Sequence, residues 1–264
     1  MWVEYVWGKQ SYSQLAYKHK VSIPTVQNWI DTYQHQDSYP YQELKPQPVH
    51  LIIDAFYWKR GEGVLVFKSS NLHCCLFWFD INYESVAYYQ AGVTTLLAAG
   101  WEILSITIDG RKGVLRALEA YAPVQLCHFH QRATVTRYLS RKPKLQAIWE
   151  LKRIASTLTE TDPHSFEFFL TAWHQKHESF LKEKTYHPSG RWSYTHKRVR
   201  SCYYSLIRNI PHLFTYQKHP GTPNTTNTMD GYISHLRTLH RVHRGTILRR
   251  RRKITEEVLR GKTT

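Results

Sequence analysis

Two aspartates stand directly after short aliphatic runs, where a folded chain could use them to hold a metal ion. Asp54 closes the run 49–53, and Asp109 closes the run 103–108. Both runs are typical of strands, so we expect each carboxylate to emerge at a strand end beside a sheet. Two carboxylates in contact repel each other unless a cation lies between them. Taken alone, Asp54 is better explained as an aspartate in a strand-end turn, so the inference depends on a set of carboxylates.

Asp230 is the residue that we expect to complete the set. It follows the polar motif 224–227 at the start of a helix expected over about residues 226–240. Asn227 and Asp230 are three residues apart, so they share a face of that helix. The same pattern also arises without a metal, when an asparagine caps the helix and an aspartate favours its positive end.

Oxygen ligands alone suit Mg²⁺ or Mn²⁺ rather than zinc. Two such ions can activate an attacking water or 3′-hydroxyl and stabilise the leaving oxygen in an in-line phosphoryl displacement. We therefore expect two Mg²⁺ or Mn²⁺ ions as cofactors, with Asp54, Asp109 and Asp230 as metal ligands and catalytic residues.

The elements that must position these carboxylates follow an α/β order. The hydrophobic pattern predicts strands at 49–54, 63–68, 73–79, 103–108 and 124–127, and helices at 84–99 and 114–120. This order matches that of RNase H-like proteins, a mixed sheet with helices on both faces. In that order the strands ending at Asp54 and Asp109 are neighbours, which would bring the two carboxylates together.

Residues 131–215 are rich in Trp, Phe, Lys and His and predict a mostly helical insertion, with a strand considered only around 201–207. Trp173, Trp192 and Tyr194 could stack on unpaired bases, although aromatics of this kind are more often core residues. The expected domains are 1–36, a linker over 37–48, and 49–264 with the insertion inside it.

Residues 8–33 predict two short helices joined by a tight turn, a helix-turn-helix that precedes the α/β domain. Ser22 can cap the second helix, and Pro24 suits its first turn. Helix-turn-helix domains place their second helix in the major groove of DNA. The candidate DNA contacts are Thr25, Gln27 and Asn28 on that helix and Lys18 and Lys20 before it. A helical hairpin that packs on the rest of the protein or on a partner is the alternative.

Charge points to a polyanionic partner. The 264 residues carry 36 Lys and Arg against 20 Asp and Glu, a formal charge of +16, and nucleic acid is the commonest polyanion. No stretch approaches the roughly 18 apolar residues that span a bilayer, and the first ten residues lack the apolar region of a signal peptide. The four cysteines form no disulfide ladder, which fits a reducing cytosol.

Two basic segments add candidate DNA contacts. Arg111 and Lys112 follow the second aspartate and could hold a DNA strand near it. Arg249 and Arg250 begin the run 249–253, which would add salt-sensitive affinity without sequence preference. A solvated tail is an equally good interpretation of that run. Glu256 and Glu257 are poorer third ligands than Asp230, because they follow this run and not the polar motif.

Four segments together resemble bacterial insertion-sequence transposases of the DDE/DDD type, close to the Mutator-like group. They are 51–55 (LIIDA), 106–113 (ITIDGRKG), 125–131 (QLCHFHQ) and 224–237 (NTTNTMDGYISHLR), and the trailing 243–245 (HRG) is similar too. With the helix-turn-helix, the resemblance covers most of the chain outside the insertion. It implies Asp54 and Asp109 as the first two metal ligands and Asp230 as the third, where many relatives carry glutamate.

Cys127 and His130 match the family's Cys-x-x-His signature after the second aspartate. The resemblance implies that this pair, with Asn227, organises the site or contacts DNA. On chemistry alone the pair could be half of a zinc site completed by residues 73–75, or a buried thiol beside a polar histidine.

The leading hypothesis is a transposase that binds terminal inverted repeats, cleaves the ends of a mobile element and joins 3′ ends to target DNA. The resemblance implies a homodimer on double-stranded DNA, no membrane, and a cytoplasmic, nucleoid-associated location in a bacterium. Two alternatives stay open: a metal-dependent nuclease that does not join strands, and a non-catalytic DNA-binding regulator or inactive transposase remnant.

Overall fold

The computed structural model describes residues 1–35, 38–111 and 113–261, which divide into two compact units. Unit 1 comprises residues 1–104 and 226–264, and unit 2 comprises residues 105–225. The strands β1 (Pro48–Lys59), β2 (Glu62–Ser69), β3 (Cys75–Ile81), β4 (Glu102–Ile108) and β5 (Val124–Leu126) form a five-stranded sheet in the order β3-β2-β1-β4-β5. Strands β1, β2 and β3 pair antiparallel and β4 pairs parallel with β5, so the sheet is mixed. The predicted α/β class is confirmed.

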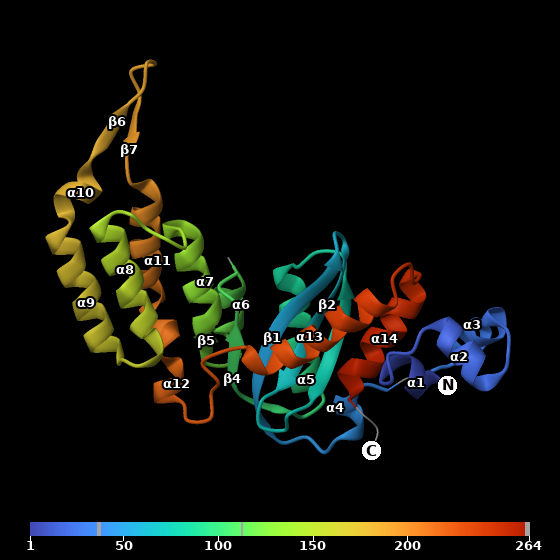
Figure 1. The fold of residues 1–264 in the computed structure, drawn as a ribbon. Helices are drawn as coiled ribbons and strands as arrows, with labels where there is room; N and C mark the ends of the chain where they lie inside the picture. Colours follow the sequence, from blue (N-terminus) through green and yellow to red (C-terminus); the bar gives the residue numbers. More distant parts are fainter. Residues whose placement is uncertain (36–37, 112, 262–264) are drawn as a thin grey trace. The chain divides into compact units, whose positions relative to one another are not determined.

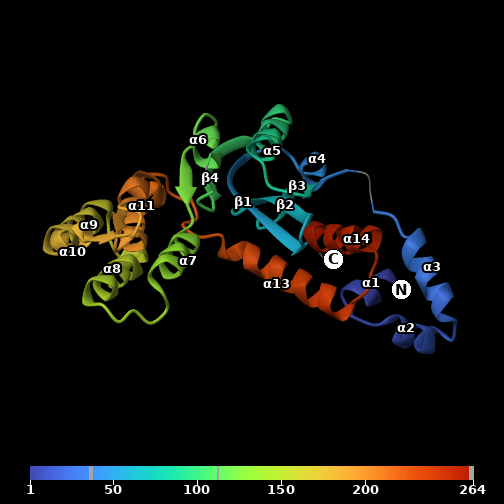
Figure 2. The same cartoon turned by 90° about the horizontal axis from the view of Figure 1, so that it is seen from above.

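Helices cover both faces of the strands β1, β2 and β3 in unit 1 (Figures 1 and 2). On one face, Ile52 and Val66 share a buried cluster with Met229 of α13 (Asn227–Val242). On the other face lies α5 (Val86–Ala98), where Gly92 meets the ring of Phe67. A Cβ at Gly92 would lie 2.1 Å from that ring, so close packing there requires glycine.

The two helices predicted within residues 8–33 are confirmed as α2 (Tyr12–His19) and α3 (Ile23–Thr32). A capping box of Ser11 and Gln14 begins α2, and the Ser22 side chain accepts the Thr25 N–H at the start of α3. A further helix, α1 (Trp2–Val6), precedes them. The expected linker contains a short helix, α4 (Pro40–Glu43), which begins at a proline, a residue suited to a first helical turn.

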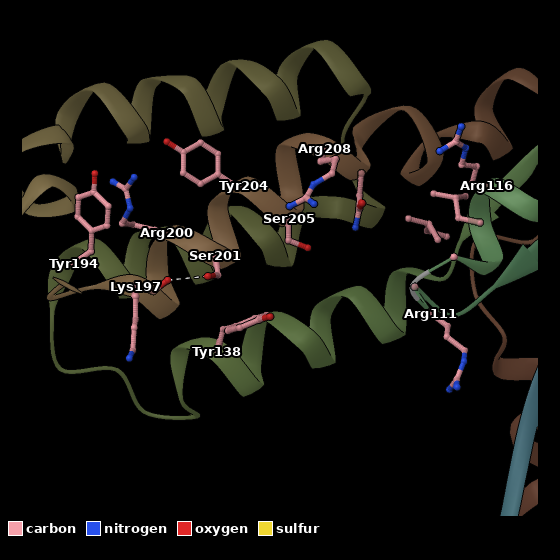
Figure 3. A pocket seen from close by; sticks show the side chains of 15 residues that line it. Arg111, Arg116, Tyr138, Tyr194, Lys197, Arg200, Ser201, Tyr204, Ser205 and Arg208 are labelled. Atoms are coloured by element: carbon pink, nitrogen blue, oxygen red, sulfur yellow. Dashed lines mark hydrogen bonds between the residues drawn. The ribbon is translucent and has the colours of Figure 1, made fainter. Parts of the chain in front are cut away.

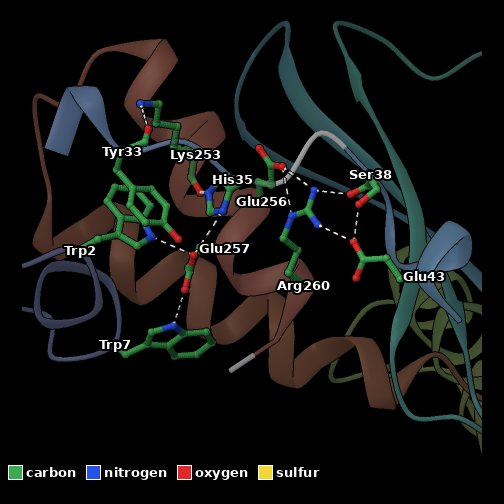
Figure 4. A network of polar contacts seen from close by, with 10 residues as sticks. All are labelled: Trp2, Trp7, Tyr33, His35, Ser38, Glu43, Lys253, Glu256, Glu257 and Arg260. Atoms are coloured by element: carbon green, nitrogen blue, oxygen red, sulfur yellow. Dashed lines mark hydrogen bonds and ion pairs between the residues drawn. The ribbon is translucent and has the colours of Figure 1, made fainter. Parts of the chain in front are cut away.

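A buried carboxylate joins the beginning of the chain to α14 (Leu248–Arg260) in unit 1 (Figure 4). Glu257 accepts the indole N–H groups of Trp2 at 2.8 Å and Trp7 at 2.9 Å. His35 lies 3.4 Å from the same carboxylate. Because a buried carboxylate is costly without partners, these contacts fix the N-terminal helices against α14.

Unit 2 contains β5, the end of β4, and a group of helices. They are α6 (Val114–Leu118), α7 (His128–Leu139), α8 (Gln146–Ser156), the 3-10 helix η1 (Thr157–Thr159), α9 (Pro163–Lys176), α10 (Glu178–Lys182), α11 (Lys197–Leu213) and α12 (Thr215–Lys218). A small antiparallel hairpin, β6 (Lys184–Tyr186) and β7 (Trp192–Tyr194), extends from these helices (Figure 1). The prediction that residues 131–215 are mostly helical is confirmed.

The strand considered around 201–207 is wrong, because these residues lie inside α11. The buried positions Val199, Cys202, Tyr203 and Leu206 recur every three or four residues, which is the helical period. Among the described residues, no helix is long and apolar enough to cross a bilayer.

Candidate functional site

Asp54 lies within β1 and not at its end, so the predicted strand end is wrong. The strand continues to Lys59 because residues 55–57 keep pairing with β2, and Asp54 stands opposite Val66 in that register. The side chain is half-buried, and its Oδ1 accepts the Ala55 N–H at 2.8 Å. The carboxylate is thus attached to a paired strand, which holds it more firmly than a turn would.

Asp54 and the first turn of α13 belong to the same face of the sheet. Side chains alternate along a strand, so Ile52, Asp54 and Phe56 point to one side. Ile52 and Phe56 pack in one buried cluster with Met229, which sets that side as the one covered by α13. Asp230 follows Met229 directly and is exposed in the first turn of α13.

Asn227, a predicted organising residue, is the first residue of α13 and is exposed. It stands one turn before Asp230, so the predicted helix start is confirmed. Thr226, the residue before it, is buried and forms the N-cap position. The roles of Asn227 and Asp230 toward a metal stay predictions.

Lys68 is a residue that the sequence reasoning missed. It lies on β2 opposite Ile52, on the face that carries Asp54, and only 3% of it is exposed. Its Nζ donates to the Thr228 carbonyl at 2.9 Å and lies 5.1 Å from the ring centre of Tyr232. Burial lowers the pKa of Lys68. The lysine therefore ties β2 to the turn of α13 that carries Asp230.

The signal for Lys68 was present in the sequence. It is a lone charged residue directly after the apolar run 63–67, and Lys is rarely buried unless it is partnered. What the sequence does not give is the partner, because Thr228 lies 160 positions further along the chain.

Asp109 and Cys127 occupy equivalent places in unit 2. The parallel register pairs Ile108 of β4 with Leu126 of β5, so the residues that follow each strand stand level at its carboxyl end. The Cys127 N–H donates to the Ile108 carbonyl at 2.8 Å, which fastens the start of α7 to the end of β4. Asp109 is half-buried, and its Oδ1 accepts the backbone N–H of Arg111 at 3.2 Å.

The Cys-x-x-His motif begins α7. Cys127 is buried at the N-cap position, and His130 is half-buried in the first turn. Between them, His128 is fully buried and its Nε2 donates to the Leu213 carbonyl at 2.6 Å. Burial lowers the pKa of His128, so this histidine is neutral near pH 7. The motif thus anchors the part of the chain that follows β5.

The three aspartates are divided between the units, with Asp54 and Asp230 in unit 1 and Asp109 in unit 2. Within residues 1–35, 38–111 and 113–261, no three His, Cys, Asp or Glu side chains gather closely enough to hold a metal ion. Carboxylate oxygens are nevertheless the donors that Mg²⁺ and Mn²⁺ prefer, so the chemistry of the three residues fits these ions.

The candidate DNA contacts of α3 lie on a helix anchored by its opposite face. Val26 and Ile30 are fully buried, whereas Asn28 is exposed and Thr25 and Gln27 are half-buried. The two lysines before α3 differ from each other. Lys20 is exposed, whereas the Lys18 ammonium lies 2.5 Å from Glu4 Oε1.

The basic run 249–253 lies in α14, so the solvated-tail interpretation is wrong. Arg250 forms a two-point ion pair with Asp31 at the end of α3, with distances of 2.6 and 2.7 Å. Lys253 donates to the Asp31 and Tyr33 carbonyls. Arg249 is exposed, as is Arg111, and Lys112 lies outside the described residues.

Of the three aromatics considered for base stacking, Trp173 is a core residue. It is buried, and its indole N–H donates to the Ala147 carbonyl at 2.8 Å. Trp192 is exposed beside the Lys184 ammonium, and the Tyr194 ring lies 3.8 Å from the Arg200 guanidinium.

The sequence matches no known protein-family model and no curated protein.

Proposed function

We propose that this protein is a transposase of the DDE/DDD type, built on an RNase H-like sheet. The observation that carries the proposal is the placement of Asp54 on the sheet face covered by α13, whose first turn holds Asp230. The position of Asp109 directly after β4 supports it, because that strand belongs to the same mixed sheet. In this proposal the three aspartates are the catalytic metal ligands.

Asp54, Asp109 and Asp230 would hold two Mg²⁺ or Mn²⁺ ions, which activate the attacking oxygen and stabilise the leaving oxygen. The protein's own part is to fix carboxylates on rigid elements: Asp54 on a paired strand, Asp109 after β4, and Asp230 on a helix held by Lys68. Such positioning is the main contribution that a protein makes to phosphoryl transfer.

DNA recognition in this proposal belongs to α3 and to exposed cations. Asn28 can pair with the edge of an adenine in the major groove. Lys20, Arg111 and Arg249 are exposed and would contact phosphates. Arg250 instead serves to hold α3 through Asp31. A homodimer would bring two element ends together.

The test is a cleavage and joining assay on the element's ends in Mg²⁺, with Asp54→Asn, Asp109→Asn and Asp230→Asn. We expect each variant to bind the ends in Ca²⁺ like the wild type and to lose both cleavage and joining by at least about 100-fold. Asp162→Asn is the matched control. Asp162 is exposed at the N-cap of α9, where asparagine caps equally well. Full activity of Asp230→Asn would exclude Asp230 as the third ligand.

A non-catalytic DNA-binding regulator is the second candidate function. It is favoured by α3, which is anchored by the buried Val26 and Ile30 and exposes Asn28 for DNA contact without needing the carboxylates. Under this alternative the wild type would bind the element's ends but release no cleaved product in Mg²⁺ or Mn²⁺. A nuclease, in contrast, would cleave the ends and give no joined product.

A further inference from the structure

Unit 2 contains a cavity of about 820 Å³ whose walls are basic (Figure 3). Its cations come from four parts of the chain: the segment after Asp109, α6, and both the beginning and the middle of α11. They are Arg111, Arg116, Lys197, Arg200 and Arg208. None of the described residues that line the cavity is an aspartate or a glutamate. A concave surface of one charge sign concentrates its field and attracts anions.

Three of these cations, Arg116, Lys197 and Arg208, have no acidic partner among the described residues. All three are exposed. Grouped cations without counter-charges repel each other, so the arrangement is favourable when an anion binds among them. Phosphate is an anion that arginine recognises well, through paired N–H donors.

Three tyrosines, Tyr138, Tyr194 and Tyr204, line the same cavity. The Arg200 guanidinium lies 3.8 Å from the ring centre of Tyr194 and 5.6 Å from that of Tyr204. Arg200 also donates to the Leu181 carbonyl at 2.9 Å, which fixes its plane. The Tyr204 ring is accessible to a ligand, since 45% of that residue is exposed. A fixed cation between two rings, one of them open, is a surface on which a flat base can stack.

We propose that this cavity binds unpaired nucleotides of a DNA strand, with the arginines on the phosphates and Tyr204 on a base. Bases in a duplex are stacked on each other, so only an unpaired base offers its face to a tyrosine ring. The volume lies within the range of about 300–1,000 Å³ found for ligand pockets. The lining begins at Gly110, directly after Asp109, so the bound strand would lie beside that carboxylate. This last point rests on the proposed function, in which Asp109 is catalytic.

The test measures the affinity of the full chain for labelled oligothymidylate of about 12 nucleotides and for a duplex of equal length. All titrations are made in EDTA, so that metal-dependent cleavage plays no part. The first variant is Arg116→Gln combined with Arg208→Gln, and the second is Tyr204→Leu. Arg153→Gln is the control, since Arg153 is an exposed arginine of α8 outside the cavity.

We expect the double arginine variant to bind the single strand at least about tenfold more weakly. The slope of its log-log salt dependence should fall by about 0.7 for each phosphate that the variant no longer neutralises. Tyr204→Leu should weaken single-strand binding about 5- to 100-fold and leave the salt dependence unchanged. Duplex affinity should stay within about twofold of the wild type in both variants, as should both affinities in Arg153→Gln.

Unchanged single-strand affinity in the arginine and tyrosine variants would overturn the proposal, and so would an equal loss on the duplex. All altered side chains are exposed, so thermal unfolding of the variants should match that of the wild type. The outcome is separate from the proposed function. A wild type that neither cleaves nor joins, yet shows these single-strand affinities, would refute the transposase and leave the strand-binding cavity standing.

Discussion

His240 shows how one side chain makes stability depend on pH. It lies on α13 beside the rings of Phe56 and Trp58, and its Nε2 has no hydrogen-bond partner among the described residues. Burial, and secondarily the Arg251 charge, lower the pKa of His240 from 6.5 to about 4. The protonated form is therefore disfavoured in the folded protein.

We predict that the free energy of unfolding decreases as the pH falls from about 6.5 to about 4. In this window the unfolded chain binds a proton at His240 and the folded chain does not, so acid favours unfolding. The decrease should reach about 2–3 kcal/mol. Urea titrations across this pH range measure it. His240→Phe, which keeps an aromatic ring against Phe56 and Trp58, should flatten the profile. An unchanged profile would assign the acid sensitivity to another group.

Lys68 connects two elements, because it joins β2 to the first turn of α13. We predict that Lys68→Met leaves the protein folded, since an apolar side chain of similar length suits a buried site. Without the bond to Thr228, the amides of residues 228–232 should exchange with solvent at least about tenfold faster, because the start of α13 is freer to open. Hydrogen exchange measures this, and Mg²⁺-dependent cleavage should fall in parallel.

The control for Lys68 is Lys218→Met, which removes an exposed lysine at the end of α12 in unit 2. It should change neither the amide hydrogen exchange of α13 nor Mg²⁺-dependent cleavage. If the amides of residues 228–232 exchange as slowly in Lys68→Met as in the wild type, the lysine does not stabilise the start of α13.

Sequence periodicity identified most strands and helices, and the errors have physical causes. β1 was expected to end at Asp54, but it continues because the turn at Gly61, with a φ of 76°, lets β2 pair with its second half. Residues 201–207 carry tyrosines and an isoleucine that favour strands locally, yet their burial follows the helical period of α11. The arginine run concealed α14, whose buried apolar residues are Ile254, Val258 and Leu259.

The candidate site was only partly predictable for a different reason. The aspartates and the Cys-x-x-His motif stand beside recognisable strands and helices, so their residue types and spacing carried the signal. Lys68 and the basic cavity depend on contacts between segments far apart in the chain, such as the region of Gly110 and α11. Such contacts leave no local pattern.

At the scale of unit 1, the N-terminal helices are fixed to the C-terminal helix. The Arg250–Asp31 pair joins α14 to α3, and the hydrogen bonds from Arg250 lower the pKa of Asp31. A part-buried ion pair with two hydrogen bonds stabilises the folded state more than an exposed ion pair does. The orientation of the proposed recognition helix thus depends on α14.

We predict that Asp31→Asn and Arg250→Gln each destabilise the protein by about 1–2 kcal/mol and weaken binding to duplex DNA. The double variant should lose at most about 0.5 kcal/mol more stability than either single variant, because each single change already removes the same interaction. Urea unfolding and duplex titrations measure the two effects. Fully additive losses would mean that the two residues act independently.

The Glu257 contacts with Trp2 and Trp7 have a consequence for biosynthesis. The indoles leave the ribosome before the carboxylate that receives their N–H groups, which follows some 250 residues later. Until then the indoles of Trp2 and Trp7 have no acceptor from α14, so a nascent chain must keep α1 from wrong associations. Slower translation of the segment that forms α14 should lengthen this interval and increase the demand for chaperones.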